Sequence, residues 1–222
     1  HGNVHALQSV LADIATRRVD RTVCLGDLVG YGAFPNEVIQ LIRERDYAFV
    51  DTLNRQFRAH QGLDDPASFL REAFREAHRT IQRVGQAQKP PIQPMTTGVA
   101  CLIQDGVAQW AHVGDSRAYL IRQGQVALRT RDHTRVAEMV ESGLLTEQQA
   151  RLHPLRNHVS LCLGGTEQPP PVTLGPKVYL TPGDILLLCS DGLWSAVSES
   201  RLVNTLEGDA IPRAIETLAE AA

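Results

Sequence analysis

The 222-residue chain has the composition of an ordinary globular protein. Hydrophobic residues make up 43% of it and charged residues 21%, which excludes the profile of an intrinsically disordered chain. It carries 22 Lys and Arg against 25 Asp and Glu, so it lacks the basic excess of nucleic-acid-binding proteins. No apolar run approaches the roughly 20 residues that span a bilayer. We therefore expect a soluble protein that binds neither nucleic acid nor a membrane.

The cysteines indicate a reducing compartment. There are four of them, Cys24, Cys101, Cys162 and Cys189, and none has the CxxC spacing of a zinc knuckle. Buried reduced thiols are the simpler interpretation, and the cytoplasm is the expected location. The sequence starts at His1 rather than Met, and no signal-peptide pattern precedes it, so we expect a fragment.

Helical and strand patterns alternate in the first part of the chain. The spacing predicts a helix over 4–16, a buried strand over 21–26 and a helix that begins at Pro35. A third helix begins at Asp65-Pro66. Its apolar stripe consists of Phe69, Leu70, Ala73, Phe74, Ala77, Ile81 and Val84. Three prolines between Lys89 and Pro94 predict an extended connector.

The segment 97–130 is the clearest β region. Four runs, GVACLIQ, VAQWAHV, RAYLIR and QVALRT, alternate with Gly-containing turns and predict an antiparallel meander. A helix over 133–143, a capping-box pattern at Thr146 and a strand over 184–190 follow, and two helices after Ser198 finish the chain. Strands grouped in hairpins beside helices favour an α+β fold with an antiparallel sheet flanked by helices.

Two aspartates stand next to glycine just after apolar strands. They are Asp115, which follows Gly114, and Asp191, which precedes Gly192. A strand end fixes a carboxylate, and glycine lets water or substrate approach the backbone, which suits a hard divalent cation. Gly-Asp and Asp-Gly are also favoured turn pairs, so the local pattern alone leaves a simple turn open.

The sequence around these aspartates resembles the bacterial branch of the metal-dependent protein phosphatases of the PP2C (PPM) family. The resemblance runs over residues 95–206, through AHVGDSRAYLIRQG, TRDHT, ESGLLTEQQA, HPLRN, LCLGG and PGDILLLCSDGLW. It implies a layered α+β sandwich that hydrolyses phosphoserine or phosphothreonine in proteins with water activated by two or more Mg or Mn ions. On this resemblance Asp191 is the shared ligand of two ions, Asp115 reaches an adjacent third ion, and no side chain acts as the nucleophile.

Parts of the family pattern are missing. The first metal motif, an Asp before a DGMGG-like loop, is absent in that form, and the final Asp-Asn pair does not occur before residue 222. A centre with fewer carboxylates binds metal less tightly, so we expect weakened catalysis.

The first 45 residues instead resemble the start of a calcineurin-like metallophosphoesterase. The phrases HGNVHALQSVLADI and VCLGDLVGYGAFPNEVIQLIRER are similar to its DxHGN and GDxxxxG blocks. That resemblance makes His1 and Asp27 metal ligands, although no GNHD block follows. We therefore expect a metallophosphoesterase-like segment over 1–45 joined to an incomplete phosphatase domain over 46–222. A natural fusion, a gene rearrangement and an assembly artefact would all produce this sequence.

Asp27 is also a candidate replacement for the missing first phosphatase ligand. It follows an apolar strand and precedes two glycines and a helix, as that ligand does in the PP2C pattern. If it takes this role, its carboxylate should lie roughly 4 to 7 Å from that of Asp191.

Other polar residues are assigned to structure. We expect Arg117 to form an ion pair or to be a solvated strand residue rather than bind phosphate. We expect Asp132 and His133 to cap the helix that follows them. We expect Trp110 and Trp194 to contribute packing.

The sequence thus predicts a metal-dependent serine/threonine phosphatase. Two alternatives stay open: a metallophosphoesterase acting on phosphodiesters or nucleotides through His1 and Asp27, and an inactive phosphatase-like regulatory module. The physiological substrate, the choice between Mg and Mn and the oligomeric state are not predicted.

Overall fold

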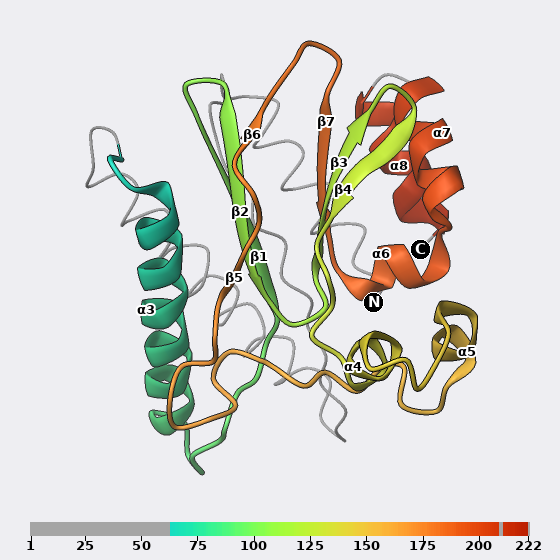
Figure 1. Cartoon of the computed structure of the whole chain (residues 1–222). Helices are drawn as coiled ribbons and strands as arrows, with labels where there is room; N and C mark the ends of the chain where they lie inside the picture. Colours follow the sequence, from blue (N-terminus) through green and yellow to red (C-terminus); the bar gives the residue numbers. More distant parts are fainter. Residues whose placement is uncertain (1–62, 209–210, 222) are drawn as a thin grey trace.

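The computed structural model describes residues 63–208 and 211–221. In this part of the chain two antiparallel sheets face each other, with helix α3 outside one sheet and helices α7 and α8 outside the other (Figure 1). The predicted α+β sandwich of antiparallel sheet flanked by helices is therefore confirmed. The predicted helices and strand before residue 63 lie outside the described residues.

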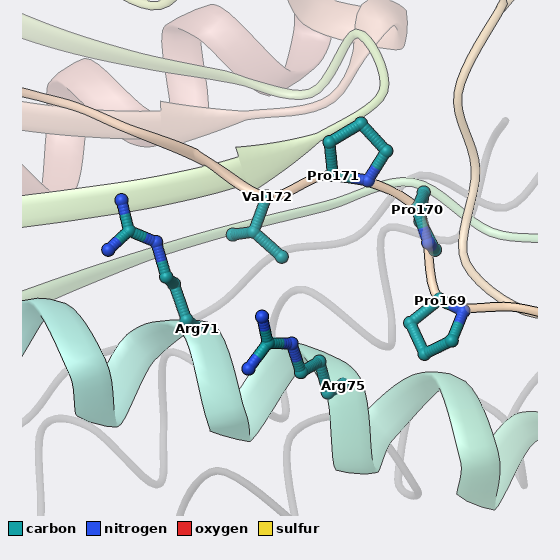
Figure 2. A pocket seen from close by; sticks show the side chains of 6 residues that line it. All are labelled: Arg71, Arg75, Pro169, Pro170, Pro171 and Val172. Carbon is teal, nitrogen blue, oxygen red and sulfur yellow. The ribbon is translucent and has the colours of Figure 1, made fainter.

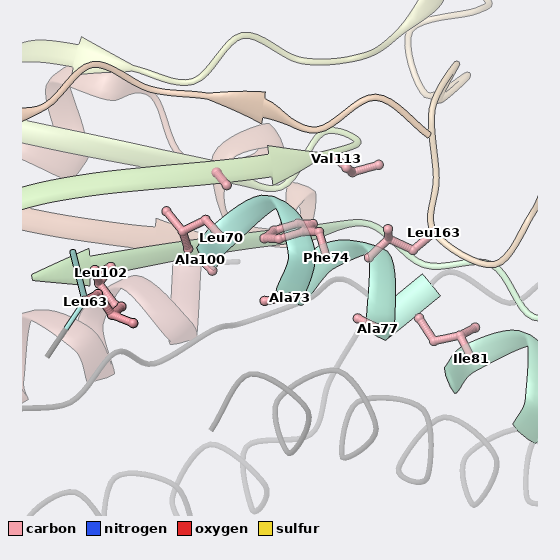
Figure 3. Close-up of a cluster of buried hydrophobic side chains, with 11 residues drawn as sticks. Leu63, Leu70, Ala73, Phe74, Ala77, Ile81, Ala100, Leu102, Val113 and Leu163 are labelled. Atoms are coloured by element: carbon pink, nitrogen blue, oxygen red, sulfur yellow. The ribbon is translucent and has the colours of Figure 1, made fainter. Parts of the chain in front are cut away.

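Helix α3 (Pro66–Gln86) begins where the sequence predicted. The Asp65 carboxylate accepts hydrogen bonds from the backbone N–H groups of Ala67 and Ser68, at 3.1 and 3.2 Å, and so caps the helix. The apolar stripe faces the first sheet, and Phe74 is fully buried there (Figure 3). The cluster between helix and sheet contains Leu63, Leu70, Ala73, Phe74, Ala77, Ile81, Ala100, Leu102, Ala111, Val113 and Leu163.

The first sheet is built on a hairpin. Strands β1 (Gly98–Gln104) and β2 (Val107–Val113) pair antiparallel along their whole length. The short strands β5 (Thr173–Leu174) and β6 (Val178–Tyr179) pair with the other edge of β2. This edge of β2 is therefore completed by residues that come more than 60 positions later in the chain.

The second sheet has the order β4-β3-β7. Strand β3 (Arg117–Arg122) pairs antiparallel with both β4 (Gln125–Arg129) and β7 (Ile185–Cys189). The predicted continuous meander over 97–130 is therefore wrong: β2 and β3 belong to different sheets. The chain changes sheet at Gly114, whose φ of +101° disfavours any side chain and whose added Cβ would lie 2.2 Å from Cγ2 of Thr97.

Five helices follow the β region within the described residues. They are α4 (Arg135–Glu141), α5 (Glu147–Leu152), α6 (Asp191–Ala196), α7 (Glu199–Gly208) and α8 (Ile211–Ala221). The capping box predicted at Thr146 is present, whereas α6 was not predicted. None of the helices in the described ranges has both the length and the apolar character that a membrane crossing requires.

Apolar clusters fill the space between the layers. Between the two sheets lie Val99, Cys101, Ala108, Trp110, Ala118 and Leu120. Outside the second sheet, Tyr119 and Cys189 pack against Leu202, Leu206 and Leu218 of the C-terminal helices. Burial raises the pKa of the Cys101 and Cys189 thiols to about 12, so both are unreactive thiols at neutral pH.

Candidate metal centre

Neighbouring strand ends bring Asp115 and Asp191 to the same edge of the second sheet. In the β3–β7 pair Arg117 lies opposite Cys189. Asp115 stands two residues before that pair and Asp191 two residues after it, so both leave the sheet at one edge. Asp115 is 4% exposed, and Asp191 is half-buried as the first residue of α6. The placement of these two residues at adjoining strand ends agrees with the sequence analysis.

The corner that carries Asp115 is held by hydrogen bonds on both sides. The His133 backbone N–H donates to the Gly114 carbonyl at 2.9 Å, and the Gly114 N–H donates to Nδ1 of His133 at 3.1 Å. The hydroxyl groups of Thr97 and Ser116 are 2.8 Å apart and hydrogen-bonded. Because Nδ1 of His133 accepts, Nε2 carries the proton of the neutral ring and donates to Oγ1 of Thr173 at 2.9 Å.

His133 does not cap a helix as predicted, and neither does Asp132. The N-cap of α4 is Thr134, whose hydroxyl accepts from the Ala137 N–H at 3.3 Å. Asp132 instead receives two hydrogen bonds from Arg117, from Nε at 2.8 Å and from the terminal nitrogen at 2.7 Å. The local pattern before a helix suits capping, but the long-range partner of Asp132 sits on β3, which the local pattern does not reveal.

Arg117 forms the ion pair that was expected of it. Its side chain and that of Asp132 are only 12% and 13% exposed. Burial opposes the charge of Arg117, but the hydrogen bonds and charge of Asp132 outweigh it and raise the pKa of the guanidinium. The guanidinium carbon also lies 3.6 Å from the centre of the Trp194 ring, which is cation–π distance.

Trp194 does more than pack. Its indole Nε1–H donates to the backbone carbonyl of Asp115 at 2.9 Å. No local pattern predicts this bond, because the two residues are 79 positions apart. Trp110, in contrast, is a buried packing residue between the sheets, as expected.

Two stacked histidines lie behind the corner. The rings of His112 and His133 are 4.5 Å apart at an angle of 13°. Nε2 of His112 lies 2.7 Å from the carbonyl of Arg131, which can only accept, so the proton of His112 is on Nε2. Burial lowers the pKa of both rings, and burial with the neighbouring His112 lowers that of His133 to about 4.

These histidines should make the fold sensitive to acid. A pKa lowered on folding means that the unfolded chain binds more protons between pH 6.5 and 4, so the contribution of His133 is complete above pH 6.5 and is lost as the pH falls toward 4. The free energy of unfolding should fall by at most about 1.4 kcal/mol per pH unit. Solvent screening at the exposed edge of the ring makes this fall smaller. Urea unfolding of His133→Gln at pH 7.5, 6 and 5 should show a smaller pH dependence than the parent chain, although His112 contributes in both. An identical slope in the two proteins would contradict this assignment.

The donor type of the two aspartates fits a hard divalent cation. Carboxylate oxygens are the ligands that Mg and Mn prefer, and both aspartates leave one sheet edge. Within residues 63–208 and 211–221, however, no three His, Cys, Asp or Glu side chains gather closely enough to hold an ion. Asp27 and His1 lie outside the described residues, and so does the expected separation of Asp27 from Asp191. The described part thus supplies two candidate ligands of a larger set.

The two glycines beside the aspartates have different surroundings. Gly114 is in contact with Thr97 and forms the corner itself. Gly192 is the second residue of α6, and a Cβ there would lie 3.5 Å from the Ser190 hydroxyl oxygen, which is ordinary contact distance. The need for glycine is therefore shown at residue 114 and not at residue 192.

A separate groove of about 470 Å³ lies between α3 and the segment 169–172. Arg71 and Arg75 of α3 line one side of it, and Val172 with the three prolines before it lines the other (Figure 2). The lining contains neither Asp115 nor Asp191, so this groove is distinct from the candidate metal centre.

Comparison with known proteins supports one of the two family resemblances. Residues 40–139 match the family model of protein phosphatase 2C. The serine/threonine protein phosphatase PstP of Mycobacterium tuberculosis is 34% identical over 163 residues, which are 72% of this chain and 30% of that protein. Protein phosphatase PhpP of Streptococcus pneumoniae is 36% identical over 140 residues, 63% of this chain and 55% of PhpP. The chain therefore spans about half or less of the length of these relatives.

The fold comparison extends the similarity over most of the chain. A crystal structure of the Mycobacterium tuberculosis phosphatase PstP/Ppp superposes with a TM-score of 0.74 at 25% identity, covering 90% of this chain and 91% of that one. Another structure, of the PstP catalytic domain in complex with 2 manganese ions, has a TM-score of 0.70 at 24% identity, covering 90% of each chain.

The metallophosphoesterase resemblance of residues 1–45 gains no support from these findings, and its residues lie outside the described part. The match of residues 40–139 to the family model, the relatives and the shared fold together support a domain of the protein phosphatase 2C family, of the bacterial type, in this chain.

Proposed function

We propose that this chain is a metal-dependent phosphatase that hydrolyses phosphoserine and phosphothreonine in proteins. The observation that carries the proposal is the meeting of Asp115 and Asp191 at one edge of the second sheet. The relatives named serine/threonine phosphatase support the substrate class. A cytoplasmic location belongs to the same proposal, because the described cysteines are all free thiols.

Two carboxylates of this chain would hold cations at the proposed centre. Asp191 and Asp115 supply oxygen ligands for Mg or Mn, and the manganese in the PstP catalytic domain supports that choice of metal. When bound, a pair of such cations polarises the phosphoryl group and lowers the pKa of water, so that the protein needs no nucleophilic side chain. The hydrogen bonds and the close Thr97 contact of the Gly114 corner keep the Asp115 backbone in place.

The number of metal ligands determines the turnover rate that we expect. Two carboxylates carry less charge than a complete PP2C centre, so we expect the 222-residue chain to turn over a phosphoserine peptide slowly. We also propose that the phosphatase domain covers 46–222, with Asp27 as the candidate replacement for its missing first ligand. His1 is a candidate ligand only on the metallophosphoesterase resemblance, which the comparisons do not support. Full, Mn-dependent turnover at the rate of PstP assayed in parallel would contradict the expected weakness.

Asp191→Asn tests the metal assignment directly. The substitution keeps the shape but removes the charge, so calorimetry should show at least a tenfold loss of Mn²⁺ affinity. Asp64→Asn, on an exposed residue just before α3, is the matched control and should leave the affinity unchanged. Unchanged affinity in Asp191→Asn would overturn the proposed centre.

A phosphatase-like binding module is the second candidate. It is favoured by the absence of a third donor beside Asp115 and Asp191 among the described residues. Calorimetry of the parent chain separates the two candidates, because a module without a working centre would show no Mn²⁺ binding at all.

A further inference from the structure

Helix α6 carries both a candidate ligand and the residue that contacts the other ligand. Asp191 is its first residue, and Trp194 follows one turn later. The indole of Trp194 donates to the backbone carbonyl of Asp115, at 2.9 Å. One hydrogen bond therefore ties the corner that carries Asp115 to the helix that carries Asp191.

The indole is itself held in place from the other side. Arg117 stacks on its ring at 3.6 Å, and the paired hydrogen bonds that Arg117 donates to the Asp132 carboxylate fix the plane of that guanidinium. Arg117 also donates to the Tyr119 hydroxyl at 2.9 Å. Arg117 and Asp132 have little exposure and Trp194 is half-buried, so these contacts restrain the position of the Trp194 ring.

Helix α6 has few restraints of its own. It has only six residues, and its N-cap residue Ser190 makes no side-chain capping hydrogen bond. A helix this short is not stable by itself, so its orientation depends on tertiary contacts. The hydrogen bond from Trp194 to Asp115 is such a tertiary contact. It lies at the edge of the second sheet where the chain leaves the strands at Asp115 and Asp191.

We propose that Trp194 is a positioning residue that sets the spacing between Asp115 and Asp191, with Arg117 and Asp132 holding its ring. The inference rests on the proposed function, because it assigns to these aspartates a common cation site. Ligand spacing governs affinity for a divalent ion, and groups that orient ligands typically change metal affinity 10- to 100-fold when removed.

Trp194→Phe is the variant that tests the hydrogen bond. It keeps an aromatic face for Arg117 but removes the indole N–H, so Mn²⁺ affinity measured by calorimetry should fall about tenfold. Trp110→Phe, at the chain's only other tryptophan, is the matched control and should bind Mn²⁺ like the parent chain. Thermal unfolding of both variants shows whether a loss of affinity is simply a loss of fold.

A fluorescence titration tests the same inference without altering Trp194. In Trp110→Phe, Trp194 is the single tryptophan, so its emission should change as Mg²⁺ saturates the site. In Trp194→Phe the remaining emission comes from Trp110 and should not respond. A silent Trp194, with Mg²⁺ binding verified by calorimetry, would overturn the inference even if Trp194→Phe fails to fold.

The outcomes separate this inference from the proposed function. If Asp191→Asn loses Mn²⁺ affinity while a folded Trp194→Phe retains it, the positioning role is wrong and the metal centre stands. If neither variant changes the affinity, the metal centre itself is wrong, and the positioning role fails with it.

Discussion

Asp132→Ala should lower the free energy of unfolding by about 3 to 5 kcal/mol, because it leaves the buried Arg117 charge without its partner. Arg117 is only 12% exposed, so little water can reach its guanidinium to compensate for the lost carboxylate. For a chain of this size the melting temperature should fall by about 10 °C. Denaturant unfolding monitored by circular dichroism measures the difference.

Glu141→Ala is the matched control for this prediction. Glu141 pairs with Arg131 at the surface, where the two side chains are 64% and 53% exposed. Exposed pairs contribute at most about 1 kcal/mol, so this variant should unfold almost like the parent chain. Equal losses in the two variants would mean that burial does not distinguish the pairs.

Phe74→Ala should destabilise the chain by about 3 to 5 kcal/mol, through lost apolar burial and the cavity that remains. Phe74 is fully buried between α3 and the first sheet, where Leu70, Ala77 and Val113 belong to the same cluster (Figure 3). The measurement is urea unfolding with a fixed m-value.

Phe69→Ala, on the same helix, is the control for Phe74. Phe69 is only partly buried against the cluster, so removal of its ring should cost clearly less. A larger loss at Phe69 than at Phe74 would contradict the packing described for α3.

Helix α3 shows what local signals determine. Asp65, the proline after it and the apolar spacing predicted the start of the helix and its buried face, because capping and helical periodicity are short-range effects. The same holds for the Thr146 capping box and for strand β7.

The division of the β region into two sheets could not be predicted in that way. A strand has the same alternation whichever partner it pairs with, so the runs before and after Gly114 gave no sign that they part. Their second partners are β5 and β6 on one side and β7 on the other, all beyond residue 170. The Thr97 side chain against Gly114 is a further long-range cause of the corner.

The candidate site shows the same limit. The sequence singled out Asp115 and Asp191 because each follows an apolar strand and adjoins a glycine. Asp132, His133 and Trp194 were assigned to capping or packing, since their partners Arg117, Gly114 and Asp115 are distant in sequence. When the hydrogen-bond partner of a polar residue is distant in sequence, the role of that residue can be assigned only from the folded structure.

The pairing of β3 with β7 also fixes when the centre can first exist. Hairpins such as β3–β4 form from neighbouring residues and can assemble as soon as they leave the ribosome, whereas β7 joins β3 from more than 60 residues later. At typical translation speeds, Asp191 is therefore synthesised several seconds after Asp115. A nascent chain that stops before residue 185 carries only one of the two candidate ligands, so the proposed centre could bind metal only after β7 has joined the sheet.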